Sequence, residues 1–531
     1  MVQRLIKFFV GTSSISGATA ILAVTLLVSN MLGVIRDHYL AQKIPATILD
    51  TYFAAFRLPD LIFNTLVLGA VSAAFIPVFA ELVAKGKRAE ANHIGSTLIT
   101  TALIGTMVLA AIFFVAMPGL MGYLVPDFPP DKLALTVTNA RNLLASPVLF
   151  GVSFIISGML TATNRFVATA LAPIFYNGSI ILGTLLAADH YSVSGVVWAV
   201  IIGSFLHLIV QLPSLATIGF RFRPLIDWRN EQVRKIVKLM IPRTIGLGAN
   251  QLMLLAFTFM AAKIGGGSIA IYTFADNIQT TPVVIFATSI AQALFPTLAR
   301  HHALSRGSEF RRHIERAIST IIFFLTPMAV GMVLLRAQIV RLVLGSGYFG
   351  WEETIIAART LGWFAPGLVA GGLLPLLYRA FFARHNTIIP TIGGIVAVAI
   401  SIITASALVS SNGVVALPIG FSVGMIIEAV MLYYLLRRSV ELNDRKLALD
   451  GARVLVASAI MAAAVQGGKM LVGTLLPLTH SIEVLAQLAL ATALGVIVYF
   501  PATKLLGHPG LQVNLTQSFL AKLNGTRNGN L

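Results

Sequence analysis

Long apolar stretches separated by short polar connections dominate the chain. About fourteen of these stretches are long enough to cross a bilayer as an α-helix, which needs roughly 20 consecutive apolar residues. Their approximate bounds are 13–35, 52–82, 94–117, 134–160, 166–187, 193–220, 236–262, 269–298, 318–335, 354–382, 388–409, 414–436, 454–472 and 482–506. The pattern predicts an all-α polytopic membrane protein that no long soluble domain interrupts.

Basic residues are distributed unevenly between the two sides of the predicted membrane. If the N-terminus is cytoplasmic, 27 of the 38 Lys and Arg residues fall on the cytoplasmic side, whereas opposite connections such as PDFPPD and SSNG carry few. Cytoplasmic loops collect Lys and Arg, so both termini are predicted to be cytoplasmic. The basic connections at 221–235 and 300–316 are expected to form amphipathic helices at the inner leaflet.

Composition excludes several classes of function. The chain is 57% hydrophobic and 11% charged, whereas about a quarter of residues are charged in soluble domains. The net charge of +18 is explained by loop orientation, and no nucleic acid is expected. Cysteine is absent, and no phosphate-binding loop, HExxH motif or dinucleotide fingerprint is present. We therefore expect no catalytic residue, cofactor or metal site, and interpret His301 and His302 as residues of a solvated loop.

Two motif pairs predict an internal duplication. Pro77 ends the second apolar run in AAFIPVFAEL, and Pro296 ends the eighth in QALFPTLARH, 219 positions later. TATNRFVAT and ARHNTIIP, which enter the fifth and eleventh runs, have nearly the same spacing. Transporters are often built from such repeats. We predict two six-helix bundles related by a pseudo-two-fold axis, at 1–220 and 221–440, followed at 441–531 by two extra helices and a cytoplasmic tail.

Polar side chains within or beside the spans are the candidates for function, because a charge at a helix centre costs roughly 2.5–3.5 kcal/mol. Candidates for substrate binding are Arg36, Arg57, Arg243, Asn30, Asn277 and Asn250, and candidates for charge pairing or ion coupling are Asp37, Asp50, Asp60 and Asp276. Arg36 could instead lie at the interface or pair with Asp37, and Arg57 could form a structural pair with Asp50 or Asp60. Arg141 is interpreted as an interfacial anchor.

Arginine binds phosphate through bidentate, charge-assisted hydrogen bonds. A basic cavity between the helices would therefore select an anionic or amphipathic cargo. The residues alone favour a secondary transporter, with an unidentified coupling cation left open.

Several motifs, in order, resemble the MurJ (MviN) family. They are SNMLGVIRD, DTYFAAFRLPDL with GAVSAAFIPVFAE, TATNRF with APIFYN, IPRTIGLGANQ, FADNIQTTP with FPTLARH, and YRAFFARHNTIIP. The resemblance implies a lipid II flippase of the bacterial inner membrane, within the multidrug/oligosaccharidyl-lipid/polysaccharide exporter superfamily. The cargo would be undecaprenyl-pyrophosphate-linked peptidoglycan precursor or a related polyprenyl-pyrophosphate glycolipid, and partners could include membrane lipids and cell-wall synthesis proteins.

The resemblance also implies roles for individual residues. Arg36, Asp37, Asp50, Arg57 and Asp276 match family motif positions, whereas Asn30, Phe63, Leu68 and Asn277 stand where family members often carry charge. These departures keep three alternatives open: an exporter of another lipid-linked oligosaccharide, a cation-coupled drug antiporter, and an inactive scaffold for cell-envelope proteins.

Overall fold

The computed structural model describes residues 15–67, 75–477 and 480–508. Helices dominate these residues, and no strand occurs among them. The α-helices are α2 (Ile15–Lys43), α3 (Ala46–Ile62), α5 (Ile76–Ala84), α6 (Arg88–Leu124), α7 (Pro130–Leu143), α8 (Ala145–Ala162), α9 (Phe166–Ile209), α10 (Leu212–Thr217), α11 (Glu231–Ile264), α12 (Ser268–Pro282), α13 (Ser289–Ala303), α14 (Gly307–Val343), α15 (Trp351–Ala383), α16 (Ile388–Asn412), α17 (Ala416–Val440), α18 (Asp444–Leu475) and α19 (Ser481–Leu505). The predicted all-α architecture is confirmed.

Nine helical segments of the described chain are long and apolar enough to cross a membrane. Some of them hold two of the expected spans. Helix α9 is interrupted at Ser192, whose backbone is not helical, and a short 3-10 turn, η4 (Gly413–Val415), separates α16 from α17. Each of the fourteen predicted runs overlaps one or more helices, although the exact number of membrane crossings stays a prediction.

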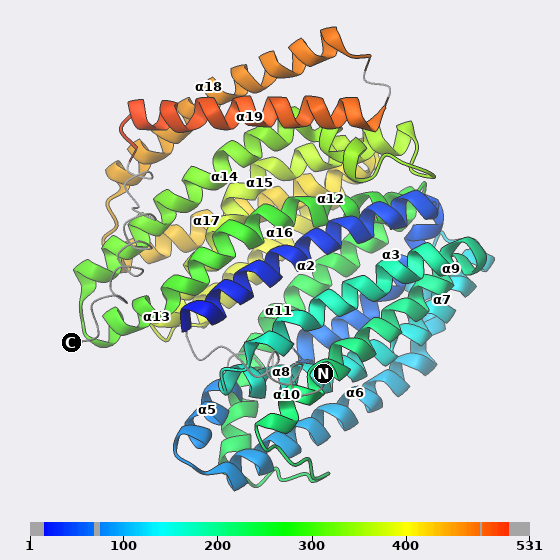
Figure 1. Ribbon diagram of the computed structural model, residues 1–531, viewed down its shortest axis with the longest axis vertical. Helices are drawn as coiled ribbons and strands as arrows, with labels where there is room; N and C mark the ends of the chain where they lie inside the picture. Colours follow the sequence, from blue (N-terminus) through cyan, green and yellow to red (C-terminus); the bar gives the residue numbers. More distant parts are fainter. Residues whose placement is uncertain (1–14, 68–74, 478–479, 509–531) are drawn as a thin grey trace. The chain divides into compact units, whose positions relative to one another are not determined.

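The chain divides into two compact units that interleave along the sequence. Unit 1 comprises 1–281, 340–364 and 387–424, and unit 2 comprises 282–339, 365–386 and 425–531. One core of unit 1 joins α5, α6, α8 and α11, for example through Phe79, Ile94 and Met159. In unit 2, α18 and α19 lie side by side (Figure 1), and Phe323 packs with Met461 and Tyr499 in a core shared with α14. The predicted bundles 1–220, 221–440 and 441–531 stay a prediction.

The backbone repeats its special conformations at the predicted spacing. Two π-helices occur in equivalent places, η1 (Phe63–Val67) in the second span and η3 (Val283–Thr288) in the eighth. Left-handed residues recur in the pairs Gly86 and Ser305, Asn164 and His385, Ser192 and Gly413, and Gly219 and Glu441. Their spacings are 219, 221, 221 and 222 residues. The duplication inferred from Pro77 and Pro296 is therefore present in the turns and helix breaks as well.

Close helix packing also repeats. A Cβ atom on Gly203 would lie 3.0 Å from the carbonyl oxygen of Tyr176, and one on Gly424 would lie 2.7 Å from that of Ala397. Both pairs are related by 221 residues. At Gly424 the same Cβ would also clash with Ser401 Oγ. Small residues let helix backbones approach in this way, so α16 and α17 need glycine at position 424.

One sequence expectation is wrong. Residues 221–230 form no amphipathic helix, and α11 begins only at Glu231, where Asn230 accepts hydrogen bonds from the backbone N–H groups of Gln232 and Val233. Pro224 explains part of this, because proline disfavours helix at the preceding residue. The connection is tied to α6 by a 2.9 Å contact between His93 Nε2 and Asp227 Oδ2, which lowers the pKa of the Asp227 carboxyl.

We predict that Gly424→Ala destabilises the protein by about 1–3 kcal/mol, the usual cost of overpacking a tight contact. Gly451→Ala in α18 is the matched control, because no atom lies within 4 Å of its Cβ position. There alanine should stabilise the helix by about 0.5–1 kcal/mol. Unfolding in detergent micelles measures both changes, and equal effects of the two substitutions would contradict the packing argument.

Candidate functional site

Arg36 and Asp37 form the centre of a polar group in unit 1, here called the Arg36 cluster. Arg36 donates from Nε and Nη2 to Asp37 Oδ1, at 3.0 and 2.9 Å, and from Nη1 to Asn177 Oδ1 on α9 at 3.3 Å. Asn277 on α12 donates to Asp37 Oδ2 at 2.8 Å. The cluster thus connects α2, α9 and α12, and the guanidinium already has a carboxylate partner. The side chain of Arg36 is nevertheless 22% exposed.

A second polar group, the Arg57 cluster, lies between α3, α11 and α12. Arg57 donates from Nε to Thr258 Oγ1 at 2.7 Å and from Nη2 to Thr273 Oγ1 at 3.2 Å. Within the described part of the chain, no carboxylate forms an ion pair with Arg57. Asp60 and Asp276 attract it from a greater distance. Arg57 is therefore a half-buried cation held by two neutral hydroxyl groups.

The two clusters belong to one region of unit 1. Asp276 and Asn277 are consecutive residues of α12, and Asp276 accepts a hydrogen bond of 2.9 Å from Gln279. Tyr52 and Tyr176 each lie in the neighbourhood of both Arg36 and Asp60. Arg36, Asp37, Arg57, Asp60, Asp276 and Asn277, all proposed from the sequence, are thus grouped by the fold.

Asp50 has a different environment. It is fully buried and pairs with Lys132 on α7 at 3.2 Å, so the alternative pairing of Arg57 with Asp50 is not found among the described residues. Its Oδ1 also accepts a 3.0 Å hydrogen bond from the backbone N–H of Ala270 in the first turn of α12. Such N-terminal amides have no partner within their own helix. Asp50 therefore joins α3 to α7 and α12.

No contact with the two clusters is described for the remaining predicted site residues. Asn30 donates to the carbonyl of Leu26 in its own helix at 2.9 Å, and Asn250 is exposed on α11. Arg243 lies in the helical backbone of α11, and its side chain is outside the described part of the structure. Leu68 is outside the described residues altogether. The assignment of Asn30, Asn250 and Arg243 to the site stays a prediction.

Phe63, which stands where family members often carry a charge, packs against other aromatic side chains. It begins the π-helix η1, and its ring lies 5.1 Å from the rings of both Phe150 and Phe154 on α8. Aromatic pairs at this separation contribute about 0.5–1.5 kcal/mol beyond area burial. Phe63 therefore packs in an aromatic group with Phe150 and Phe154.

Sequence reasoning did not find several polar partners. Thr258, Thr273 and Asn177 are ordinary polar residues of apolar runs, and nothing in the sequence indicates which arginine they contact. Glu428 is different, because it is a lone carboxylate in the apolar run GMIIEAVML, which is a signal of function or pairing in a membrane helix. In unit 2 it is 2% exposed and accepts a 2.6 Å hydrogen bond from Tyr378.

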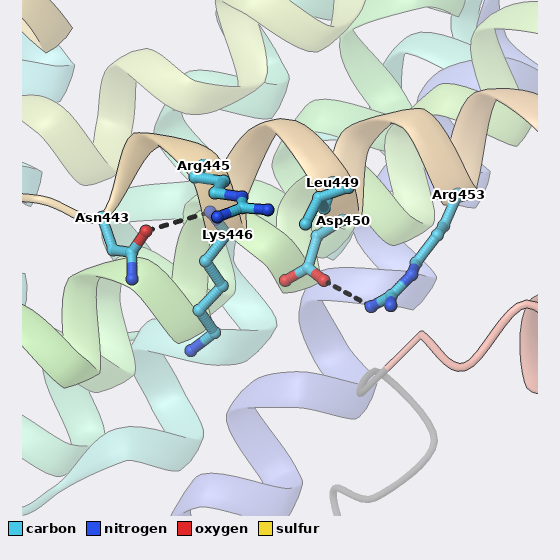
Figure 2. A pocket seen from close by; sticks show the side chains of 6 residues that line it. All are labelled: Asn443, Arg445, Lys446, Leu449, Asp450 and Arg453. Atoms are coloured by element: carbon cyan, nitrogen blue, oxygen red, sulfur yellow. Dashed lines mark hydrogen bonds and ion pairs between the residues drawn. The ribbon is translucent and has the colours of Figure 1, made fainter.

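A small pocket lies at the start of α18 in unit 2 (Figure 2). Its volume is about 200 Å³, and it is lined by Asn443, Arg445, Lys446, Leu449, Asp450 and Arg453. Asn443 accepts a hydrogen bond from the Lys446 N–H as a helix cap, and Asp450 pairs with Arg453 at 3.4 Å. Sites for drug-sized ligands are about 300–1,000 Å³. The polar residues that line this pocket cap the helix or pair with one another. The pocket is also small for a lipid-linked cargo.

Long apolar helices that enclose arginine and aspartate clusters define a polytopic membrane transporter. A family model described as "Lipid II flippase MurJ" matches residues 45–495. The chain belongs to this family, whose members are transporters rather than enzymes, and it is a multi-pass protein of the inner membrane.

Curated relatives resemble the chain over most of its length. The "Probable lipid II flippase MurJ" of Haemophilus influenzae is 28% identical over 83% of this chain and 90% of its own. The "Probable lipid II flippase MurJ" of Bdellovibrio bacteriovorus is 27% identical over 91% and 92%. The "Lipid II flippase MurJ" of Burkholderia cenocepacia is 24% identical over 78% and 82%.

Solved structures share the fold. "Lipid II flippase MurJ, inward closed conformation" has a TM-score of 0.76 and 21% identity, covering 91% of this chain and 98% of that one. "Inward-facing conformation of a multidrug resistance MATE family transporter of the MOP superfamily" has a TM-score of 0.68 and 14% identity, covering 80% and 98%. The predicted superfamily fold is therefore confirmed.

We predict that Lys132→Met lowers the free energy of unfolding by roughly 3 kcal/mol, because it leaves the buried Asp50 carboxylate without its cation. This is the low end of the usual range, since the Lys132 side chain is 20% exposed. The double variant Asp50→Asn with Lys132→Met should recover part of the loss. A double-mutant cycle measured by unfolding tests this, and additive effects would exclude the pairing.

Proposed function

We propose that the protein is a lipid II flippase. It carries undecaprenyl-pyrophosphate-linked peptidoglycan precursor from the inner to the outer leaflet by alternating access, without covalent chemistry. Family membership supports the class of cargo. Within the site, the observation that carries the proposal is the arginine at position 57, which has hydroxyl partners but no ion pair among the described residues.

Arg57 is the stronger candidate for the pyrophosphate. A half-buried guanidinium without a carboxylate partner is costly in hydrocarbon, and a phosphate would supply that partner. Thr258 and Thr273 occupy Nε and Nη2, and Nη1, which has no hydrogen-bond partner among the described residues, would donate to the cargo. Arg36 would contribute from the neighbouring cluster, and its pair with Asp37 keeps it oriented.

Asp60 and Asp276 are the candidates for a coupling cation. Among the described residues, the Asp60 carboxylate has no hydrogen-bond partner, and Asp276 has only Gln279. When an anionic cargo binds Arg57, the Asp60 and Asp276 carboxylates no longer have the Arg57 cation to balance their charge. Asp37 and Asp50, by contrast, are already paired with Arg36 and Lys132. Uptake of a cation at Asp60 and Asp276 would then restore charge balance.

The orientation follows from the distribution of basic residues. Both termini would be cytoplasmic, which places the connections after α5 and α13 on the cytoplasmic side. Membrane lipids surround the helices, and cell-wall synthesis proteins are candidate partners because they consume the flipped precursor.

Two alternative cargoes are supported by specific observations. The aromatic group around Phe63 removes a charge that family members often carry, which favours another lipid-linked oligosaccharide. The likeness to a multidrug transporter fold supports a cation-coupled drug antiporter. A reconstituted assay that compares lipid II with another polyprenyl-linked glycan and with drug efflux separates the three. Transport of lipid II at the slowest rate would overturn our choice.

We predict that Arg57→Ala and Arg36→Ala each slow lipid II flipping in proteoliposomes by about 10-fold or more, the value of one or two hydrogen bonds to a charged group. Arg141→Ala is the control, because the side chain of Arg141 bonds to the carbonyl of Phe114 on α6 and lies over its ring, away from both clusters. Its flipping rate should not change. Complementation of a flippase-deficient strain provides an independent readout, and normal growth with Arg57→Ala would remove Arg57 from the site.

A further inference from the structure

Two histidines and a glutamate meet where α13 is followed by α14 in unit 2. His301 lies in the last turn of α13, and Glu309 and His313 lie one turn apart at the start of α14. One potential ligand atom from each of the three lies within 4.8 Å of the others. Spacing of four residues places Glu309 and His313 on the same face of the helix. The three side chains therefore converge across a connection of three residues.

The imidazole rings of His301 and His313 contact each other directly. Their rings are stacked with centroids 5.0 Å apart and an interplanar angle of 24°. The Nδ1 atom of His301 is buried and has no hydrogen-bond partner among the described residues. A buried, unpartnered polar atom is costly, and a ligand at this position would satisfy it.

The first half of the chain shows that the fold does not need histidine here. The α5–α6 connection has the same turn 219 residues earlier, with hydrogen bonds from Lys87 N–H to Leu82 O and from Arg306 N–H to His301 O, both 2.9 Å. At this spacing, Leu82 corresponds to His301 and Ile94 to His313. Both are buried residues of an apolar core. Packing can thus be achieved by aliphatic residues, and the paired histidines are specific to the second half.

We propose that His301, Glu309 and His313 bind one divalent transition-metal ion, with Zn²⁺ as the best match. Two imidazole nitrogens and one carboxylate oxygen are a known three-ligand set for Zn²⁺, with the fourth position open to water. The ion would join the last turn of α13 to the first turn of α14. The eighth span contains the π-helix η3 and ends in α13. Metal binding would therefore fix the end of this span to the start of α14.

Neighbouring charge sets the expected affinity. Arg312 donates to Glu309 Oε1 at 2.6 Å, so the metal has to compete with an exposed ion pair. This cation opposes metal binding and is not a ligand. Arg312→Gln should therefore tighten metal binding, whereas loss of a ligand should weaken it. Substitutions of Arg312 and of Glu309, which lie within one helical turn, are thus expected to change the metal affinity in opposite directions.

The experiment uses the full chain, purified with an affinity tag other than polyhistidine and treated with a chelator. Co²⁺ absorption reports the coordination, and competition by Zn²⁺ gives its affinity. We expect one ion per chain. His301→Leu with His313→Ile, which copies the first half and preserves packing, should abolish binding, and Glu309→Gln should weaken it by roughly 10-fold or more.

His302→Ala and His385→Ala are the matched controls. These histidines lie nearby, with their rings 6.1 Å apart, but outside the three-residue group. Their variants should bind Zn²⁺ as the parent does, and Zn²⁺ should raise the unfolding temperature of the parent but not of the Leu/Ile variant. Absence of one-to-one binding, equal losses in the controls, or no gain from Arg312→Gln would each overturn the proposal. None of these measurements depends on flipping.

Discussion

Backbone hydrogen bonding in hydrocarbon is the constraint on which this structure depends. A spanning segment has no water to satisfy its N–H and C=O groups, so it must be helical or be covered where it departs from a helix. Among the described residues, several of these departures occur in corresponding places in the two halves. The π-helices η1 and η3 interrupt the second and eighth spans, and left-handed residues at Ser192 and Gly413 reverse the chain. Irregular backbone has thus been kept through duplication.

The same solvent restricts where charge can lie. Asp50 is fully buried, but it has a cation and a helix amide as partners, so its charge stabilises the contact between three helices. Arg57 has a different environment, since two hydroxyl groups hold its position without cancelling its charge. The distinction matters for mechanism. A neutralised charge contributes to folding, whereas a positioned charge without an ion pair can exchange partners during transport.

The architecture was largely predictable from the sequence, and the partners of the polar residues were not. Apolar length and basic connections indicate helices and their order because each signal is local. The 219-residue spacing is visible because the second and eighth spans end in similar motifs, AAFIPVFAEL and QALFPTLARH. Arg57 and Thr258, by contrast, are 201 residues apart, and Asp37 and Asn277 are 240 apart. No periodicity encodes such contacts. The helix expected over 221–235 begins only at Glu231, because basic, amphipathic composition does not show the effect of Pro224 on the residue before it.

The two halves share a backbone but differ in their chemistry. The second span contributes Arg57 and Asp60, whereas the eighth contributes Asp276 and Asn277, and these residues lie in one region of unit 1. The positions that are aliphatic at Leu82 and Ile94 are histidines at 301 and 313. A duplicated scaffold supplies matched helix breaks, which movement between two access states requires. Because the side chains of the two halves differ, one set of residues can bind the charged end of an asymmetric cargo. A site with the same side chains in both halves could not distinguish the two ends of that cargo.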